Sequence, residues 1–176
     1  VRGAELEGTS PETVVAPLLP EGTRLKGARV KRTAEGAFGS TVWTLRNGVR
    51  VVVKPTDFMT DQVCLYARVP GGRSLLSDEE MLAAQVLDYY IGQTGVAESD
   101  AALLRKQLAG KTVRCWPGTG AYENGFSGTS SPKDVETLLQ LVYLYLAQPR
   151  FDGETFGVVM EQLRHSYRNR TADPSF

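Results

Sequence analysis

The sequence is poor in the side chains that usually carry chemistry. Its 176 residues include one histidine and two cysteines, and 20 basic side chains balance 20 acidic ones. A single histidine excludes any site that needs two imidazole ligands. The zero net charge argues against a nucleic-acid binder and against an anionic membrane surface as partner. The longest apolar run, 138–147, is too short to cross a bilayer, which takes about 20 residues.

The two cysteines are far apart in the sequence. Cys64 and Cys115 are each isolated, which excludes a Cys-x-x-Cys zinc knuckle or redox pair. Both lie in apparent strands, so we expect two small buried side chains. A single disulfide is allowed if those strands adjoin, and the pair does not define a redox compartment.

No catalytic pattern is complete. Ser127 lies in a Gly-Phe-Ser-Gly-Thr segment that resembles a nucleophile elbow, but Thr129 stands where the second glycine is needed. The glycine-rich segments 70–74 and 116–120 lack the spacing of a P-loop or a dinucleotide-binding turn. We interpret them as turns whose glycines allow positive φ. His165, on an amphipathic helix, is expected to be a surface or half-buried residue.

The first 40 residues differ from the rest. They contain three of the nine prolines and no sustained apolar period, which predicts an interdomain linker or strap over 1–40. Regular structure is expected from Thr41. Runs 42–45 and 49–53 flank Asn47-Gly48, which predicts a β-hairpin with a type I′ turn. Strict alternation over 61–69 predicts a half-buried antiparallel strand.

Two pairs of helices follow. Ser77 with Glu80 forms a capping box, which predicts a helix that ends at Gly92 or Gly95. A second helix is expected from Ser99-Asp100 to Gly110, with Leu104 and Leu108 buried, and strands are expected at 111–116 and 121–127. The helix 135–147, which follows Ser131-Pro132, is almost wholly apolar, so we expect it to be buried on more than one side. A last helix is expected to begin near Asp152.

The element order βββ-αα-ββ-αα predicts an α+β fold. We expect a mainly antiparallel sheet with paired helices packed on one face, in one domain over 41–176. The chain begins at Val1 without a signal pattern and ends directly after a helix, so we expect a piece of a longer protein that stops inside this domain. An uncovered helix 135–147 would then make the isolated chain self-associate.

Four segments resemble one family. They are Trp-Thr-Leu-Arg-Asn-Gly-Val-Arg-Val-Val-Val-Lys at 43–54, Gly-Gly-Arg-Ser at 71–74, Ser-Ser-Pro-Lys-Asp-Val-Glu-Thr-Leu-Leu from Ser130, and Gln-Pro-Arg-Phe-Asp at 148–152. Their order and spacing are similar to M16 zinc metallopeptidases of the pitrilysin and insulinase type. The pattern most resembles the first domain of the non-catalytic C-terminal half of a bacterial, PqqL-like M16 protein.

The resemblance implies that a zinc site has been lost. Active M16 domains carry His-x-x-Glu-His on the helix after the glycine pair, where two His bind zinc and the Glu activates water. The corresponding window here reads Ala84, Gln85, Val86, Leu87 and Asp88. The downstream glutamate ligand should lie near His165, but 162–167 contains no Glu. We therefore expect no catalytic residue, no metal ligand and no activity in this chain alone, with zinc bound in the catalytic half of the full-length peptidase.

The implied function is structural. By resemblance, the chain packs against other domains of the same peptidase and forms a wall of the chamber that holds the peptide substrate, with no peptide-binding residue assigned. One alternative is a structural or assembly module of the same fold without protease context. Another is an enzyme that uses Asp88, Glu123 and His165. The family resemblance also suggests a periplasmic or secreted location.

Overall fold

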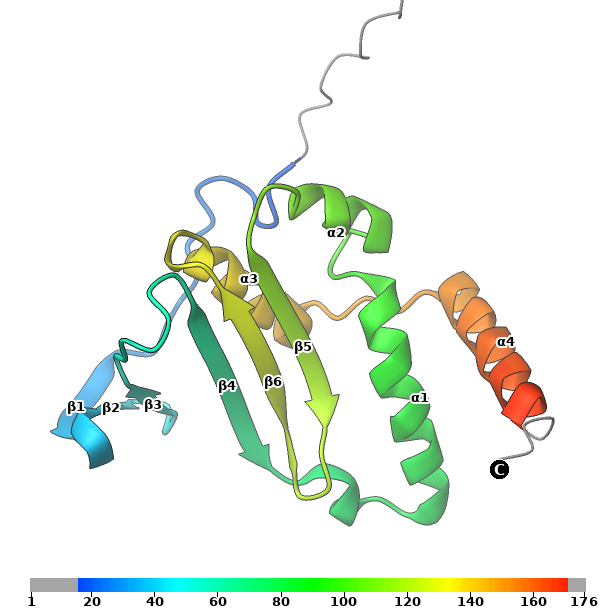
Figure 1. Cartoon of the computed structure of the whole chain (residues 1–176), viewed down its shortest axis with the longest axis horizontal. Coiled ribbons are helices and arrows are strands. Elements are labelled where there is room, and N and C mark those ends of the chain that lie inside the picture. The colour runs from blue at the N-terminus through cyan, green and yellow to red at the C-terminus, as the bar shows by residue number, and fades with distance from the viewer. Residues whose placement is uncertain (1–15, 171–176) are drawn as a thin grey trace, which may run out of the picture.

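The computed structural model describes residues 16–170. These residues form six strands and four α-helices, with short 3₁₀ turns between some of them (Figure 1). The strands are β1 Val30–Glu35, β2 Thr41–Leu45, β3 Arg50–Val53, β4 Val63–Pro70, β5 Val113–Thr119 and β6 Glu123–Ser130. The helices are α1 Asp78–Thr94, α2 Ala101–Gln107, α3 Val135–Ala147 and α4 Gly153–Arg170. The predicted α+β class is confirmed.

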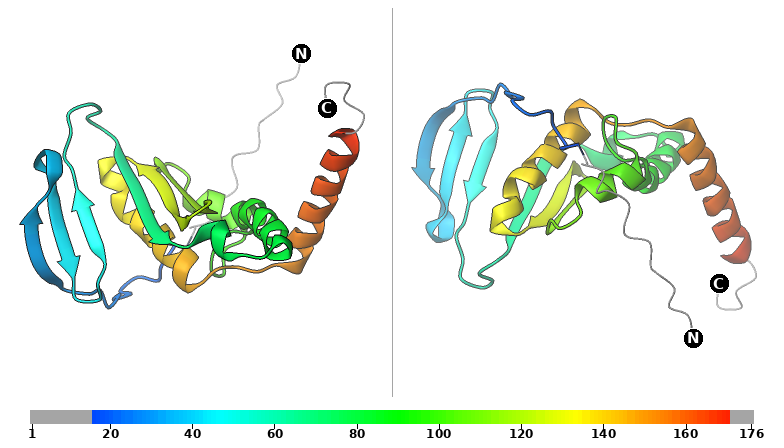
Figure 2. Two further views of the ribbon diagram at one scale, coloured as in Figure 1. Left: turned by 90° about the horizontal axis from the view of Figure 1, so that it is seen from below. Right: turned by 90° about the horizontal axis from the view of Figure 1, so that it is seen from above.

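The strands form two sheets, whereas a single sheet was expected. One sheet has the order β1-β2-β3 and the other the order β4-β6-β5, and every pairing is antiparallel. Figure 2 shows the first sheet beside the main body of the fold. The connection after β3 contains Pro55, which has no N–H to donate to a ladder, and β4 pairs with β6 instead of β3.

Regular structure also begins earlier than expected. β1 lies inside segment 1–40 and pairs with β2, and Thr33 stands opposite Trp43. Sequence reasoning missed this strand because its charged residues break the apolar pattern. In the preceding segment, the Gln107 Nε2 atom donates to the carbonyl oxygen of Ala16 at 2.9 Å, so this extended stretch contacts the end of α2. The division into linker and domain stays a prediction.

The β2–β3 hairpin is confirmed, but its turn is not type I′. Gly48 has φ +90°, whereas Asn47 does not have positive φ. The N–H of Gly48 donates to the carbonyl of Leu45 and the N–H of Leu45 donates to the carbonyl of Val49. This is the pattern of a three-residue loop, a type I turn followed by a glycine in the left-handed region. The third loop residue, Arg46, explains why the two-residue turn does not form.

The predicted helix starts are confirmed. The side chain of Ser77 accepts from the Glu80 N–H and the Glu80 carboxylate accepts from the Ser77 N–H, which closes the capping box of α1. Helix α1 ends at Thr94 and is followed by Gly95 as its C-cap, with φ +83°. Asp100 caps α2, but Leu104 and Leu108 are only half-buried. Within residues 16–170, no helix combines the length and apolarity that crossing a membrane requires.

Helix α3 forms the centre of the core. It lies across one face of the β4-β6-β5 sheet, where Leu138, Leu141 and Leu144 are buried and Tyr145 contacts the ring of Phe126 (Figure 1). Burial on more than one side was expected, and this is wrong for the described residues. Leu139 and Leu146 on the outer side are 53% and 68% exposed. The apolar composition of α3 therefore leaves an uncovered apolar stripe.

The cysteines cannot form a disulfide with each other in this fold. Cys64 is on β4 and Cys115 is on β5, and β6 lies between these strands. The expectation of two buried side chains is wrong for Cys64, which is exposed, and Cys115 is half-buried. Cys64 is one residue out of phase with the inward-facing Val63 and Leu65, so it points to the opposite side of the sheet.

The two thiols should react at very different rates. Burial raises the pKa of Cys115 to about 11, so at pH 8 only about one part in a thousand of this thiol is the reactive thiolate. We expect N-ethylmaleimide at pH 8 to modify one cysteine quickly in the native chain, and mass spectrometry should place the adduct on Cys64. Cys64→Ser should abolish the fast phase. Equal rates for both thiols in native protein would contradict the placement of Cys64 and Cys115 on opposite sides of the sheet.

Candidate functional site

The window 84–88, which the resemblance aligns with the zinc signature, lies in the middle of α1. Asp88, at its last position, is held by two partners outside the helix. Its Oδ2 atom lies 3.3 Å from Arg73 Nη2, and its Oδ1 atom accepts from the backbone N–H of Thr119 at 3.1 Å. Asp88 therefore connects α1 to the Gly-Gly-Arg turn and to the end of β5. Its carboxylate makes structural contacts with both.

Helix α4, where the resemblance puts the downstream ligand, is a neighbour of α1. The Tyr89 hydroxyl donates to Gln162 Oε1 at 3.3 Å, and the rings of Tyr90 and Phe156 meet edge to face at 5.7 Å. His165 is exposed on α4. The structure thus brings together the two helices that the resemblance pairs, and it joins them through an amide and aromatic rings.

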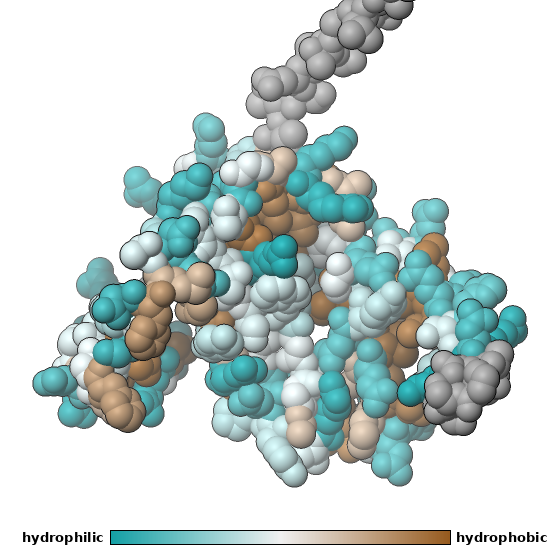
Figure 3. All heavy atoms as spheres, in the orientation of Figure 1, coloured by the Kyte–Doolittle hydropathy of each residue, from teal (hydrophilic) through white to brown (hydrophobic). Residues whose placement is uncertain are grey.

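An apolar groove of about 930 Å³ lies between α1 and α4. Figure 3 shows hydrophobic side chains gathered in this region. Ala84, Val86 and Leu87 of the signature window line it from α1, and Phe156 and Met160 line it from α4. In the position where the resemblance would put a metal centre, the chain thus has a mostly apolar surface.

The Gly-Gly turn holds the start of α1 against the β5–β6 turn. Gly71 and Gly72 have φ +145° and +75°, which confirms the interpretation of this segment as a turn with positive φ. The same interpretation is wrong for 116–120, because the chain continues as β5 to Thr119 and neither Gly118 nor Gly120 has positive φ. The N–H of Gly71 donates to Tyr122 and the N–H of Arg73 donates to Gly120. A Cβ on Gly72 would come within 2.6 Å of the Gly120 oxygen, so only glycine fits here.

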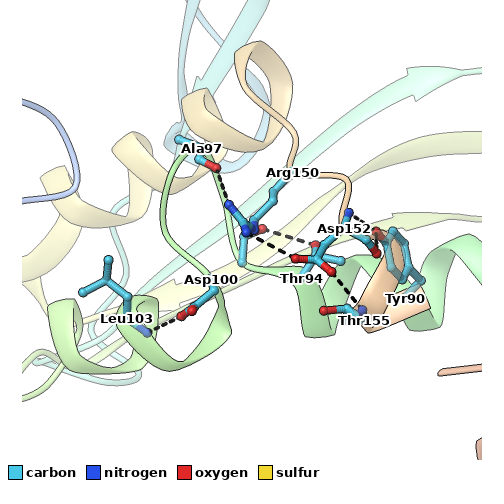
Figure 4. Close-up of polar contacts among 9 residues, drawn as sticks. Tyr90, Thr94, Ala97, Asp100, Leu103, Arg150, Asp152 and Thr155 are labelled. Atoms are coloured by element: carbon cyan, nitrogen blue, oxygen red, sulfur yellow. Dashed lines mark hydrogen bonds and ion pairs between the residues drawn. The ribbon is translucent and has the colours of Figure 1, made fainter. Parts of the chain in front are cut away.

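The corner at 148–152 fixes the start of α4. Figure 4 shows the Arg150 guanidinium pointing toward Asp152 at 3.3 Å and toward the carbonyl oxygen of Ala97. The Tyr90 hydroxyl donates to the Asp152 carbonyl at 2.8 Å. The Thr155 N–H, and to a smaller extent Arg150, hold the pKa of Asp152 below its usual range. This network explains structurally the Gln-Pro-Arg-Phe-Asp motif that supported the resemblance.

The residues present do not fit a zinc ion. Within residues 16–170, no group of three or more His, Cys, Asp or Glu side chains is placed to hold a metal. Glu123 is paired with Arg68 at 3.2 Å and Asp88 with Arg73, so Asp88, Glu123 and His165 do not form a common site. Ser127 lies in the middle of β6, whereas a nucleophile elbow needs a turn from strand to helix.

Sequence reasoning missed one surface. Among residues 16–170, no helix or strand covers the face of the β4-β6-β5 sheet opposite α3, and this face is mostly polar (Figures 1 and 3). Cross-strand pairing puts Tyr66, Ser127 and Trp116 in one row across it. The next row contains Cys64, Thr129 and Arg114. The polar alternation of 61–69 predicted half of this face, but the partner strand could not be identified from sequence.

Comparisons with solved structures identify the class of fold. No family model matches the sequence. The periplasmic protease PqqL from Escherichia coli has a similar structure, with a TM-score of 0.76 and 14% identity over 99% of this chain and 19% of that one. The ferredoxin protease FusC, solved in complex with Arabidopsis ferredoxin, gives a TM-score of 0.65 and 22% identity over 83% of this chain and 17% of that one. The fold is that of an M16 protease domain.

The sequence comparison gives the family. The zinc protease PQQL-like of Arabidopsis thaliana is 30% identical over 137 residues, which are 77% of this chain and 12% of that protein. The chain belongs to the M16 family of PqqL-like zinc proteases. It spans about an eighth of the length of this relative and corresponds to a part of a larger protease.

Proposed function

We propose that this chain is a non-catalytic M16 domain that packs against the zinc-bearing half of its full-length protease and forms a wall of the peptide chamber. The peptide substrate and the other domains of the same protein are its partners in this proposal. Its place in the C-terminal half is supported by the decayed signature window at 84–88 and by the structural role of Asp88. In this proposal, zinc is bound by the other, catalytic half of the protease.

One observation carries the proposal: the two uncovered faces of the domain differ in chemistry. The outer side of α3 is apolar, with Leu139 and Leu146 exposed at spacings that form one stripe along the helix. The open face of the sheet carries hydroxyl, charged and aromatic side chains. Permanent domain contacts are more apolar than surfaces that meet water or transient ligands. We therefore assign α3 to the permanent contact and the sheet face to the chamber.

A split-protein experiment tests this assignment. The zinc-bearing region of the full-length protein and the 176-residue chain are expressed separately and mixed, and peptidase activity and complex formation are measured. We expect neither part alone to cleave casein efficiently and the mixture to recover activity. Leu139→Glu with Leu146→Glu should prevent the complex, because two charges would be buried in an apolar contact.

Phe38→Glu is the matched control. Phe38 is 91% exposed and lies in the 3₁₀ turn between β1 and β2, so this change does not alter the surface of α3, and the variant should form the complex normally. Full activity of the zinc-bearing region without this chain would contradict the proposal. It would favour a structural or assembly module without a role in proteolysis.

The location of the protein is part of the same proposal. A periplasmic or secreted location is supported by the name of the E. coli protein with a similar fold. Fractionation of cells that express the full-length protein, followed by immunoblotting with an antibody against this chain, tests it directly.

A further inference from the structure

We infer that the open face of the β4-β6-β5 sheet binds an extended polypeptide segment that carries an acidic side chain, with Tyr66, Trp116 and Arg114 as its main contacts. The inference rests on the proposed function, because it assigns residues to the chamber wall. It adds the chemistry of the ligand, which neither the resemblance nor the comparisons supply.

The spacing of the aromatic side chains suits an extended chain. Tyr66 on β4 and Trp116 on β5 both pair with Ser127 on the central strand, so they stand two strand spacings apart, about 9.6 Å. They are 69% and 49% exposed. A helix with its side chains is about 10 to 12 Å wide and does not fit between the two rings, whereas a single extended chain does.

The sheet surface between the two rings carries only small side chains. Ser127 and its neighbours along the same face of β6, Gly125 and Thr129, are small, and Gly118 on β5 stands opposite Gly125. A segment that lies along β6 can therefore approach the sheet closely while the two rings contact its sides. Aromatic side chains in this position supply contact area at low cost in conformational entropy.

The charge on this face is positive by one unit. Arg68 lies over the Tyr66 ring at 5.8 Å and is neutralised by Glu123 at 3.2 Å. The side chain of Arg114, beside Trp116 on the same face of β5, makes no hydrogen bond or ion pair with another residue of the range 16–170. A carboxylate is the group that an arginine fork binds best, often through two parallel hydrogen bonds. The ligand should therefore carry Asp or Glu next to the contact with Trp116.

The composition of this face argues against a permanent cover. The opposite face, under α3, presents Ala67, Phe126 and Pro117 in one row and packs Phe126 against Tyr145. The open face instead presents hydroxyl groups and charges around two aromatic rings. Exposed aromatic and arginine side chains in polar surroundings are the composition of binding hot spots.

Peptide binding to the 176-residue chain tests the inference. The probe is a fluorescein-labelled ten-residue peptide of alternating Thr and Glu with a central Tyr, measured by fluorescence anisotropy. The comparison peptide has Lys in place of every Glu. We expect the acidic peptide to bind more tightly than the basic one. Arg114→Gln should lower the affinity for the acidic peptide by about tenfold, equivalent to roughly 1.4 kcal/mol. Higher salt should reduce the difference between the peptides.

Matched variants separate the contacts from general effects. Tyr66→Ser should weaken the binding of both peptides. Tyr122, at the β5–β6 turn, is also a largely exposed tyrosine, and Tyr122→Ser should leave the affinity for both peptides unchanged. Arg50→Gln on β3 is the control for Arg114→Gln, and circular dichroism confirms that each variant is folded. Equal affinity for both peptides, or an unchanged affinity in Arg114→Gln, would overturn the inference. Peptide binding as expected, together with an α3 double variant that still assembles, would overturn the proposed packing and leave this site in place.

Discussion

Leu138→Ala should be the most damaging single truncation in the described core. The Leu138 side chain is fully buried between α3 and the sheet, and a Cβ on Gly128 would come within 2.6 Å of its Cδ1 atom. Little space is therefore left for neighbouring groups to collapse into the cavity. We expect the free energy of unfolding to fall by about 2 to 5 kcal/mol. For a chain of this length the melting temperature should fall by roughly 4 to 20 °C.

Leu139→Ala provides the matched control, because it makes the same chemical change one position along the same helix. Leu139 is 53% exposed, so its truncation should cost less than about 1 kcal/mol. Denaturant unfolding followed by circular dichroism measures both variants. If Leu139→Ala were as damaging as Leu138→Ala, the assignment of the inner and outer sides of α3 would be wrong.

Gly125→Ala should break the contact between β4 and β6. A Cβ at Gly125 would overlap the carbonyl of Ala67 on the neighbouring strand, and backbone atoms cannot move aside as a flexible side chain can. Overpacking of this kind costs about 1 to 3 kcal/mol. Because β6 is the central strand, the displacement should also weaken its pairing with β5. We expect faster hydrogen exchange in β4 and β6 together with the lower stability.

Gly118→Ala is the matched control, because it makes the same substitution at the paired position on the neighbouring strand β5. Gly118 pairs with Gly125 in the β5–β6 ladder, but a Cβ there meets no atom within 4 Å, and neither glycine has positive φ. The free energy of unfolding of Gly118→Ala should stay within about 0.5 kcal/mol of the wild-type value. Equal effects at the two positions would show that the loss comes from glycine propensity and not from the close approach of Ala67.

Local sequence signals predicted the elements well where one side chain determines the backbone. Ser77 and Glu80 defined the start of α1, and Gly71 and Gly72 predicted a turn that the structure confirms. The turn after β2 was harder, because three residues separate the strands and the choice of turn type depends on that count. β1 was missed because Lys31 and Arg32 obscure its alternation.

Long-range pairing could not be obtained in the same way. The sequence does not show that β6 lies between β4 and β5. This strand order keeps Cys64 and Cys115 too far apart for a disulfide. It also brings Tyr66, Ser127 and Trp116 into one row. The apolar composition of α3 predicted burial, but it could not show that one side would be uncovered within the described residues. The partners of Asp88, in a turn and in a strand, were likewise visible only in the fold.

Zinc titration of the 176-residue chain is the most direct test of the central claim, that α1 uses Asp88 as a structural contact and carries no metal centre. Metal-free protein is mixed with equimolar zinc, passed through a gel-filtration column and analysed for bound metal, and its melting temperature is measured with and without zinc. A specific site saturated at 100 times its dissociation constant would stabilise the fold by about 2.7 kcal/mol. We predict no retained zinc and no change in melting temperature. One equivalent of zinc that survives chromatography, raises the melting temperature and is lost in Asp88→Ala would contradict the account.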